Sequence, residues 1–137
     1  MSCVFCKIAN WETPSQRVYE DDKYIAFLDI NPLNFGHTLV IPRAHYETFH
    51  DAPDEVVAEM AKIAKKLSPA IVKAAKADGY NLTVNTGRAA GQAVDHVHIH
   101  IIPRYSSDGF PPWQGRARYQ EGEMGETAKK IKEELGK

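Results

Sequence analysis

The most informative segment of the chain reads Val94-Asp95-His96-Val97-His98-Ile99-His100-Ile101-Ile102 and is followed by Pro103. Alternate residues of a β-strand point to the same face of the sheet. The three histidines would therefore share one face, and Val97, Ile99 and Ile101 would share the other. The pattern predicts a strand with a buried apolar face and a row of imidazoles opposite it.

Four further segments have the composition of strands and can pair with this one. Two of them flank a tight turn at Asp21-Asp22-Lys23, which indicates a hairpin. A third ends at Pro42, which has no N–H to continue a ladder. A fourth is joined to the histidine segment by a glycine-containing connection over residues 86–93. The four segments are residues 17–20, 24–30, 37–41 and 81–85.

Helical periodicity occurs twice. From about residue 51 to residue 79, apolar residues recur at steps of three and four, with Asp54 and Glu55 at the positive end of the helix dipole. Pro69 lies inside this pattern and removes a backbone donor, so we expect a kink or break there. The same spacing returns from Met124 to Leu135, after a loop without periodicity over residues 105–122.

These elements predict an α+β fold with a five-stranded antiparallel sheet, one long helix and a C-terminal helix. A chain of 137 residues fits a single domain. We expect that domain to span residues 1–137, with its core at about 3–105 and a C-terminal loop and helix at 106–137.

Composition argues against several classes of protein. The formal net charge of -1 removes the electrostatic reason to expect binding to nucleic acid or to anionic membranes. No apolar run approaches the roughly 18 residues that span a bilayer, and the N-terminus lacks a basic segment followed by an apolar one. We therefore expect a soluble, cytoplasmic protein that binds neither nucleic acid nor membrane.

The spacing of the histidines limits what they can do together. At a rise of about 3.3 Å per residue, neighbouring imidazoles would lie about 6.6 Å apart and the outer two about 13 Å apart, so one metal ion cannot bind all three. A neutral imidazole can act as a nucleophile toward phosphorus or as an acid–base group. The middle residue, His98, is the best candidate nucleophile. Backbone N–H groups near Gly91 and Gln92 would stabilise negative charge in the transition state.

Cys3 and Cys6 are the two cysteines of the chain. A disulfide across so short a spacing would constrain little, whereas two thiolates at this spacing are common ligands of zinc. A four-coordinate site needs two further ligands, for which His45 and His96 are candidates and His37 and His50 are competitors. The alternative is a pair of reduced thiols without metal.

The run from Gly91 to Ile102 resembles the signature of the histidine triad (HIT) family, in which His-x-His-x-His is followed by two apolar residues. The resemblance extends from Cys3 to about Tyr105 and includes the motif Gly36-His37-Thr38-Leu39-Val40-Ile41-Pro42. It implies cleavage at the α-phosphate of a purine nucleotide conjugate through a nucleotidyl-histidine at His98. The substrate would be a dinucleoside polyphosphate, a phosphoramidate or another adenylyl conjugate.

The same resemblance implies roles for residues elsewhere in the chain. Asp29 would bind the ribose hydroxyls, while His98, His100 and Gln92 would take part in catalysis. Asn85 and Gly91 would lie beside the phosphate with those three residues. An apolar slot for the base would be formed by Phe5, Ile8, Phe27 and Ile30.

Zinc-containing prokaryotic members of the family hold structural Zn²⁺ through positions that match Cys3, Cys6, His45 and His96. His96 would then position His98 through the backbone. The family also implies a homodimer, in which residues 110–113 would approach the neighbouring protomer's site. Ala93 stands where phosphoramidase-type members often carry serine, which leaves phosphoramidase specificity open.

Two other classes of function are compatible with the pattern. A metallohydrolase would use His96 and His98 to hold a catalytic metal that activates water. A nucleotide-binding or scaffold protein would keep the pocket with little turnover.

Overall fold

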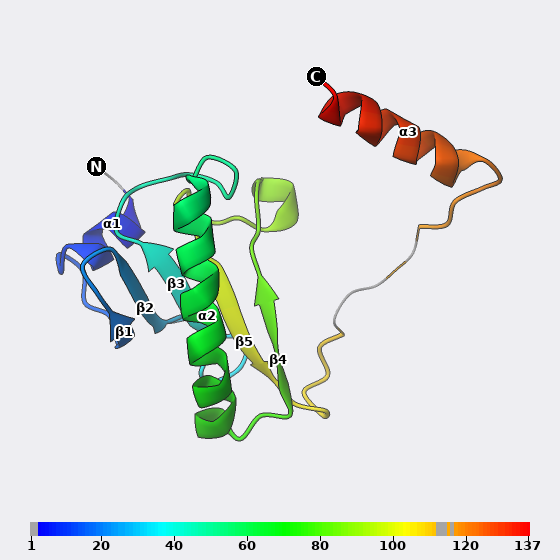
Figure 1. Cartoon of the computed structure of the whole chain (residues 1–137). Coiled ribbons are helices and arrows are strands. Elements are labelled where there is room, and N and C mark those ends of the chain that lie inside the picture. Colours follow the sequence, from blue (N-terminus) through cyan, green and yellow to red (C-terminus); the bar gives the residue numbers. More distant parts are fainter. Residues whose placement is uncertain (1–2, 112–114, 116) are drawn as a thin grey trace.

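The computed structural model describes residues 3–111, 115 and 117–137. Within these residues, five strands form one antiparallel sheet in the order β1-β2-β3-β5-β4, which confirms the predicted α+β class (Figure 1). The long helix α2 follows β3 and precedes β4 and β5 in the chain. The strands are β1 (Arg17–Glu20), β2 (Tyr24–Leu28), β3 (Thr38–Pro42), β4 (Gly79–Thr83) and β5 (Ile99–Arg104).

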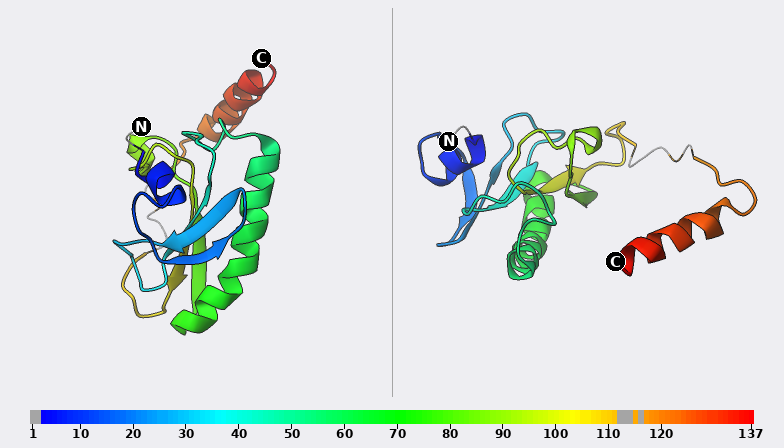
Figure 2. Two further views of the ribbon diagram at one scale, coloured as in Figure 1. Left: turned by 90° about the vertical axis from the view of Figure 1, so that its left-hand side faces the viewer. Right: turned by 90° about the horizontal axis from the view of Figure 1, so that it is seen from above.

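The sheet lies between two helices of unequal length (Figure 2). Helix α2 (Asp54–Ala75) packs on one face, where Met60 belongs to the larger apolar cluster. Helix α1 (Val4–Ala9) covers the other face, where the rings of Phe5 and Phe27 meet edge to face with centroids 5.5 Å apart. The central strands therefore send alternate side chains into two apolar cores.

A kink or break was predicted at Pro69, and a break is wrong because helix α2 is continuous through this residue. Pro69 lies on the exposed side of the helix. The carbonyl of Lys65, which loses its partner in the helix, can bond to water on that side. Asp54 and Glu55 occupy the first turn as predicted. The helix is shorter at both ends than the predicted range of 51–79.

The histidine segment is a strand only in its second half. β5 begins at Ile99, so the prediction of a strand over residues 94–98 is wrong. The physical reason is that pairing ends there: the last registered partners of β5 are Val40 in β3, opposite Ile99, and Thr83 in β4, opposite His100. At the other end, β5 continues through Pro103.

The predicted alternation of faces still holds along this segment. Val97, Ile99 and Ile101 belong to the cluster beneath α2, while His98 and His100 border a cavity on the α1 side. The spacing is tighter than an extended strand would give, because the ring centroids of His98 and His100 are 4.8 Å apart. The histidine segment therefore has its apolar side chains on the α2 side of the sheet and His98 and His100 on the α1 side.

Helix α1 is not predicted by the sequence patterns, since six residues are too few to show a period. Cys3 caps its N-terminus, and the Cys3 Sγ atom accepts a hydrogen bond from the Cys6 N–H at 3.3 Å. The helix therefore carries the cysteine pair at one end. Its buried face carries Phe5 and Ile8.

The predicted C-terminal helix is present as α3 (Glu123–Leu135). It lies apart from the sheet and the other helices, and all its residues are exposed (Figures 1 and 2). Of the segment 110–113 that was expected to approach a second protomer, residues 112 and 113 lie outside the described residues. In the part of the chain that the structure describes, no helix has the length and apolar character needed to cross a bilayer.

Candidate functional site

A cavity of about 450 Å³ opens between α1, the end of β2 and the segment that leads into β5. Its walls are mainly apolar and include Phe5, Ile8 and Phe27. Its polar groups gather at His98, His100 and Asp29. A cavity that is apolar on one side and carries a few convergent polar groups on the other suits a small amphipathic molecule.

The apolar wall is built from two elements that approach from opposite directions. Phe5 of α1 meets Phe27 of β2, and it also contacts the ring of His98 edge to face at a centroid distance of 5.0 Å. Both phenylalanines are buried, which fixes the width of the slot. Ile30, predicted to lie in the same slot, borders the cavity with 89% of its surface exposed and so forms its rim.

Asp29 lies at the side of the cavity, directly after β2. One carboxylate oxygen accepts a hydrogen bond from the Asn31 N–H at 2.9 Å, which fixes the side chain in the turn. The other oxygen lies 3.7 Å from His37 Nε2, beyond hydrogen-bonding distance. This second oxygen is available to accept hydrogen bonds from a ligand's hydroxyl groups.

The tautomer of neutral His98 follows from its contact with the main chain. Its Nδ1 lies 2.7 Å from the His96 carbonyl oxygen. Because a carbonyl can only accept, the proton must be on Nδ1, and Nε2 carries a free lone pair. A neutral His98 therefore has the form that a nucleophile requires.

His100 is fixed in the opposite tautomer through His37. The Leu33 N–H donates to His37 Nδ1 at 3.0 Å, so the proton of a neutral His37 is on Nε2. His37 Nε2 then donates to His100 Nδ1 at 2.9 Å. His100 is left with its proton on Nε2, where it can donate to a ligand. His98 therefore offers a lone pair at Nε2, whereas His100 offers an N–H at Nε2.

Burial keeps these imidazoles neutral near pH 7. It lowers the pKa of His98 from its usual value, although the His96 carbonyl and the Asp29 carboxylate oppose the shift. It lowers the pKa of His100 to about 4, and His98 and His37 add to that effect. The pKa of His37 is lowered for the same primary reason. The tautomers described above are therefore those that prevail at neutral pH.

The loop before the histidines approaches the cavity through its backbone. Gly91 lies at φ +96°, a conformation that favours glycine, and an added Cβ would be in van der Waals contact with the Asn85 amide nitrogen at 3.4 Å. Gln92, predicted beside the phosphate, is buried, and its side chain holds the loop. Its side chain accepts from the Gly87 N–H at 2.9 Å and donates to the Glu47 carbonyl at 2.6 Å.

The predicted metal ligands converge on one point. Cys3 Sγ and Cys6 Sγ lie 3.4 and 3.6 Å from His96 Nδ1. His45 Nδ1 lies 3.4 Å from Cys6 Sγ and 3.2 Å from His96 Nδ1. Around a tetrahedral zinc, neighbouring sulfur and nitrogen ligands would be about 3.5 Å apart and two nitrogens about 3.3 Å apart. The four residues therefore fit one metal ion of that geometry.

The second nitrogen of His96 supports this arrangement. His96 Nε2 lies 2.8 Å from the Pro42 carbonyl oxygen, so the proton is on Nε2 and Nδ1 is free to bind a metal. Nε2 of His96 is thereby engaged, and Nδ1 faces the two cysteines and His45. This geometry disfavours the metallohydrolase alternative, because Nε2 is not free and a metal at Nδ1 would belong to the cysteine cluster.

A second group, Asp29, His37 and His100, also places three possible ligand atoms close together. Its hydrogen bonds disfavour a metal. The Leu33 N–H needs an acceptor at His37 Nδ1, so Nε2, the atom that faces the cluster, carries the proton of the neutral ring. A metal at His37 Nε2 would move the proton of the neutral ring to Nδ1. The Nδ1–H group would then face the Leu33 N–H, and neither could accept a hydrogen bond from the other.

The chain is similar in sequence to a known protein family. A model of the HIT domain matches residues 10–107, which are more than half of the chain. The chain belongs to the HIT family. The match covers the sheet, helix α2 and the histidine segment, and it begins just after helix α1.

Several members of the HIT family are similar to this chain over most of its length. An uncharacterized HIT-like protein of Methanocaldococcus jannaschii is 54% identical over 78% of this chain and 82% of its own length. The adenylylsulfatase HINT3 of Arabidopsis thaliana is 52% identical over 77% of this chain and 54% of its own length. The adenosine 5'-monophosphoramidase HNT1 of Saccharomyces cerevisiae is 47% identical over 75% of this chain and 63% of its own length.

Solved HIT structures share the fold. The protein SMU.412c from Streptococcus mutans has a TM-score of 0.90 at 38% identity, over 98% of this chain and 85% of that chain. A Zn-bound histidine triad family protein from Mycobacterium smegmatis has a TM-score of 0.77 at 41% identity, over 86% of each chain. The four-residue cluster of this HIT chain could likewise hold a metal.

The sequence pattern predicts His37 only as a competing zinc ligand, and its contact with His100 was not predicted. The register of β3 against β5 contains the signal, because Leu39 pairs with His100 and His37 lies two residues earlier on the same side. That register was not predictable from the two segments taken separately. The contact gives this HIT site a fourth histidine.

Proposed function

We propose that this HIT protein is a nucleotide hydrolase or nucleotidyl transferase that cleaves at the α-phosphate of a purine nucleotide conjugate, with His98 as the nucleophile. The observation that carries the proposal is the pair of tautomers in one cavity. His98 presents a lone pair and His100 presents an N–H. A phosphate between them would meet a nucleophile at phosphorus and a hydrogen-bond donor at an oxygen.

The nucleoside would occupy the rest of the cavity. The base would lie between Phe5, Ile8 and Phe27, and the free oxygen of Asp29 would accept hydrogen bonds from the ribose hydroxyls. Ile30 would cover the rim. These contacts hold the part of the substrate that does not react, and so place the α-phosphorus against His98.

In the first half-reaction, His98 Nε2 attacks the α-phosphorus and forms an N–P bond. The bond from phosphorus to the leaving atom breaks, and the leaving atom keeps the electron pair. Positive charge develops on the His98 ring, where Nδ1–H already donates to the His96 carbonyl, and this hydrogen bond becomes charge-assisted. His100 Nε2–H and the backbone near Gly91 would stabilise the charge on the phosphate oxygens.

In the second half-reaction, water attacks the same phosphorus from the side that the leaving group vacated. The N–P bond breaks, its electron pair returns to Nε2, and the proton of the water passes to solvent. Both steps use the same donors, because each develops charge on the same phosphate oxygens. Another acceptor in place of water would make the reaction a transfer.

The names of two relatives narrow the substrate class. One is an adenylylsulfatase and the other an adenosine 5'-monophosphoramidase. Their substrates share an adenylyl group and differ in the group attached to it. We therefore favour adenylyl conjugates, among which the leaving group is the variable part. A dinucleoside polyphosphate has the same reacting portion.

The test is a turnover screen with adenylyl sulfate, adenosine 5'-phosphoramidate and a diadenosine polyphosphate, together with intact-protein mass analysis. We expect AMP to be released from at least one substrate and an adenylyl adduct to map to His98. The His98→Asn variant should form no adduct. Tight AMP binding without turnover of any of the three substrates would instead support a nucleotide-binding or scaffold protein.

We also propose that Cys3, Cys6, His45 and His96 bind structural Zn²⁺. The donor spacing and the hydrogen bond from His96 to Pro42 support this assignment, as does the Zn-bound relative from Mycobacterium smegmatis. The ion would join α1 to the segment after β3 and to the histidine segment. Metal analysis of the purified wild type and of Cys6→Ser tests it, with about one zinc per chain expected only in the wild type.

A homodimer is the oligomeric state that we propose. β4 is an edge strand of the sheet, and its Tyr80 and Leu82 are exposed apolar residues. A second copy that pairs with this edge would extend the sheet and cover them. Sedimentation of the wild type against a Leu82→Lys variant tests the arrangement, with a dimer expected only for the wild type.

A further inference from the structure

Trp11, just after helix α1, has an unusual backbone. It adopts φ +60°, a left-handed conformation that costs energy for a bulky residue. The position closes the helix, because the next residue, Glu12, donates its N–H to the Lys7 carbonyl at 2.8 Å. Glycine is the usual residue at such a helix end. Something other than backbone preference must favour tryptophan here.

The indole ring of Trp11 contacts a guanidinium group. Arg17 Cζ lies 3.6 Å from the centre of the ring, which is the geometry of a cation–π interaction. The Arg17 side chain is only 6% exposed. The tryptophan therefore covers a buried cation, and its backbone strain accompanies that contact.

A β-bulge turns Arg17 toward this position. Arg17 pairs with Phe27, yet Tyr19 pairs with Ala26, so Val18 is an extra residue in β1. In a regular strand, Arg17 and Tyr19 would face the same side of the sheet. The bulge places Tyr19 with the cluster under α2 and Arg17 on the α1 side, opposite Phe27.

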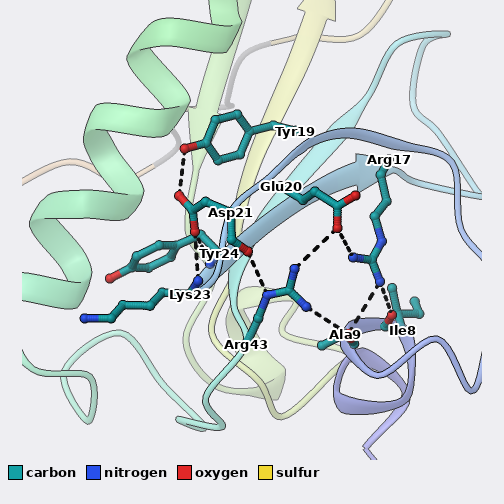
Figure 3. A network of polar contacts seen from close by, with 9 residues as sticks. All are labelled: Ile8, Ala9, Arg17, Tyr19, Glu20, Asp21, Lys23, Tyr24 and Arg43. Carbon is teal, nitrogen blue, oxygen red and sulfur yellow. Dashed lines mark hydrogen bonds and ion pairs between the residues drawn. The ribbon is translucent and has the colours of Figure 1, made fainter.

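Arg17 and Arg43 converge on the last carbonyls of helix α1 (Figure 3). Arg17 donates to the Ile8 carbonyl at 2.6 Å. Arg43, from the end of β3, donates to the Ala9 carbonyl at 3.1 Å. Both guanidinium groups also bind one carboxylate oxygen of Glu20, at 2.8 and 3.4 Å. Two cations thus bind the negative end of the helix dipole.

A six-residue helix does not hold its own shape in water, so α1 depends on contacts at its ends and on its buried face. Its first turn carries Phe5 and its last turn carries Ile8, and both residues line the proposed base slot. The two arginines bind the carbonyl of Ile8 itself and that of the next residue, Ala9. Their contacts therefore lie within one turn of the slot wall.

We propose that Arg17 and Arg43, with Trp11 and Glu20 holding Arg17, are positioning residues that keep helix α1 against the sheet and so set the affinity of the base slot. This inference rests on the proposed nucleotide site. None of the four side chains lines the cavity. Their effect would reach the base through Phe5 and Ile8. The phosphate side is fixed separately, because the His96 carbonyl orients His98 and the His37 ring orients His100.

The test compares two ligands in the same variants. AMP would occupy the base slot and the phosphate site, whereas ribose 5-phosphate has no base and would leave the base slot empty. We expect Arg17→Met and Arg43→Met to raise the AMP dissociation constant about tenfold, since affinity falls with the fraction of molecules in which α1 is docked. The dissociation constant of ribose 5-phosphate should stay within about twofold of the wild type. Arg118→Met, an exposed arginine in the C-terminal segment, is the matched control.

Trp11 supplies an independent variant that does not endanger folding. Trp11→Gly removes the strain of the left-handed backbone but also the ring over Arg17, and we expect weaker AMP binding despite unchanged or higher thermal stability. Trp11→Phe should restore most of the affinity. This combination distinguishes positioning from a general loss of structure.

The outcomes are separable. Unchanged AMP affinity in the folded arginine and Trp11→Gly variants would overturn the inference. So would an equal loss of affinity for AMP and ribose 5-phosphate, because the network would then not act on the slot. If the wild type binds neither ligand, the proposed function itself fails, whatever the variants do.

Discussion

Replacement of His98 by asparagine should separate chemistry from binding. Asparagine can keep an N–H where His98 Nδ1 donates to the His96 carbonyl at 2.7 Å, but its side chain ends before the position of Nε2. The covalent route is then closed, and only positioning and charge stabilisation by His100 and the backbone remain. We expect kcat to fall at least about 10³-fold, which corresponds to about 4 kcal/mol of lost transition-state stabilisation.

The cost to the fold should be much smaller. His98 is buried, and asparagine is smaller by roughly 40 Å³, so the void would cost at most about 1 kcal/mol. This predicts a fall in melting temperature of about 2–5 °C. The side chain borders an open cavity, which reduces the effect further. AMP should bind within about threefold of wild-type affinity, since a loss of about 0.6 kcal/mol is that factor.

Single-turnover kinetics, calorimetric AMP titration and thermal melting of the same preparation give the three quantities. His100→Asn is the matched control, because it removes a donor from the same cavity and should lower kcat by only about 10²-fold. A folded His98→Asn enzyme with kcat within tenfold of the wild type would refute the assignment of the nucleophile.

Three further outcomes are expected. A chelator at concentrations that remove zinc should lower the melting temperature of the wild type by several degrees, whereas the melting temperature of Cys6→Ser should not change. An unchanged melting temperature of the wild type after complete metal removal would contradict a structural ion. Burial and neighbouring imidazoles lower the pKa of His100 to about 4, and burial lowers the pKa of His37. Below pH ~6.5 the unfolded chain therefore binds more protons than the folded chain does. The free energy of unfolding should therefore fall as pH decreases from about 6.5 to 4, and denaturant titrations should show a flatter profile for His100→Asn. An identical slope in that variant would contradict a contribution of His100 to this pH dependence. Pro69→Ala should raise the free energy of unfolding by about 1 kcal/mol or more, because the helix regains a backbone bond on its exposed side, and a lower denaturation midpoint would contradict this.

The fold was largely predictable because its signals are periodic. Each strand except β5 lies within about two residues of its predicted range, and α2 and α3 follow the spacing of their apolar residues. The limits of β5 were missed because strand length depends on partners, and Val40 and Thr83 mark where the partners stop. The effect of Pro69 was overestimated, since a proline on the exposed side of a helix leaves the freed carbonyl in water.

The site was predictable to the extent that its residues lie in motifs. The cysteine pair and the three histidines could be assigned candidate roles from residue type and spacing alone. The roles of Arg17, Trp11 and His37 depend on a bulge, a left-handed turn and a strand register, which arise from pairings far apart in the chain. Such features have no local signature in a single sequence.

The two imidazoles that border the cavity differ in what fixes them. His98 is held by the main-chain carbonyl of His96. A substitution at position 96 changes the side chain and leaves this carbonyl oxygen in place. His100 is held by the side chain of His37, which one codon change replaces. Within this scaffold, the hydrogen bond that sets the tautomer of the proposed nucleophile therefore does not depend on a second side chain, while the one that orients the proposed phosphate donor is lost when His37 is replaced. Divergence toward new leaving groups would be expected to alter position 37 and its neighbours before it altered the attacking atom.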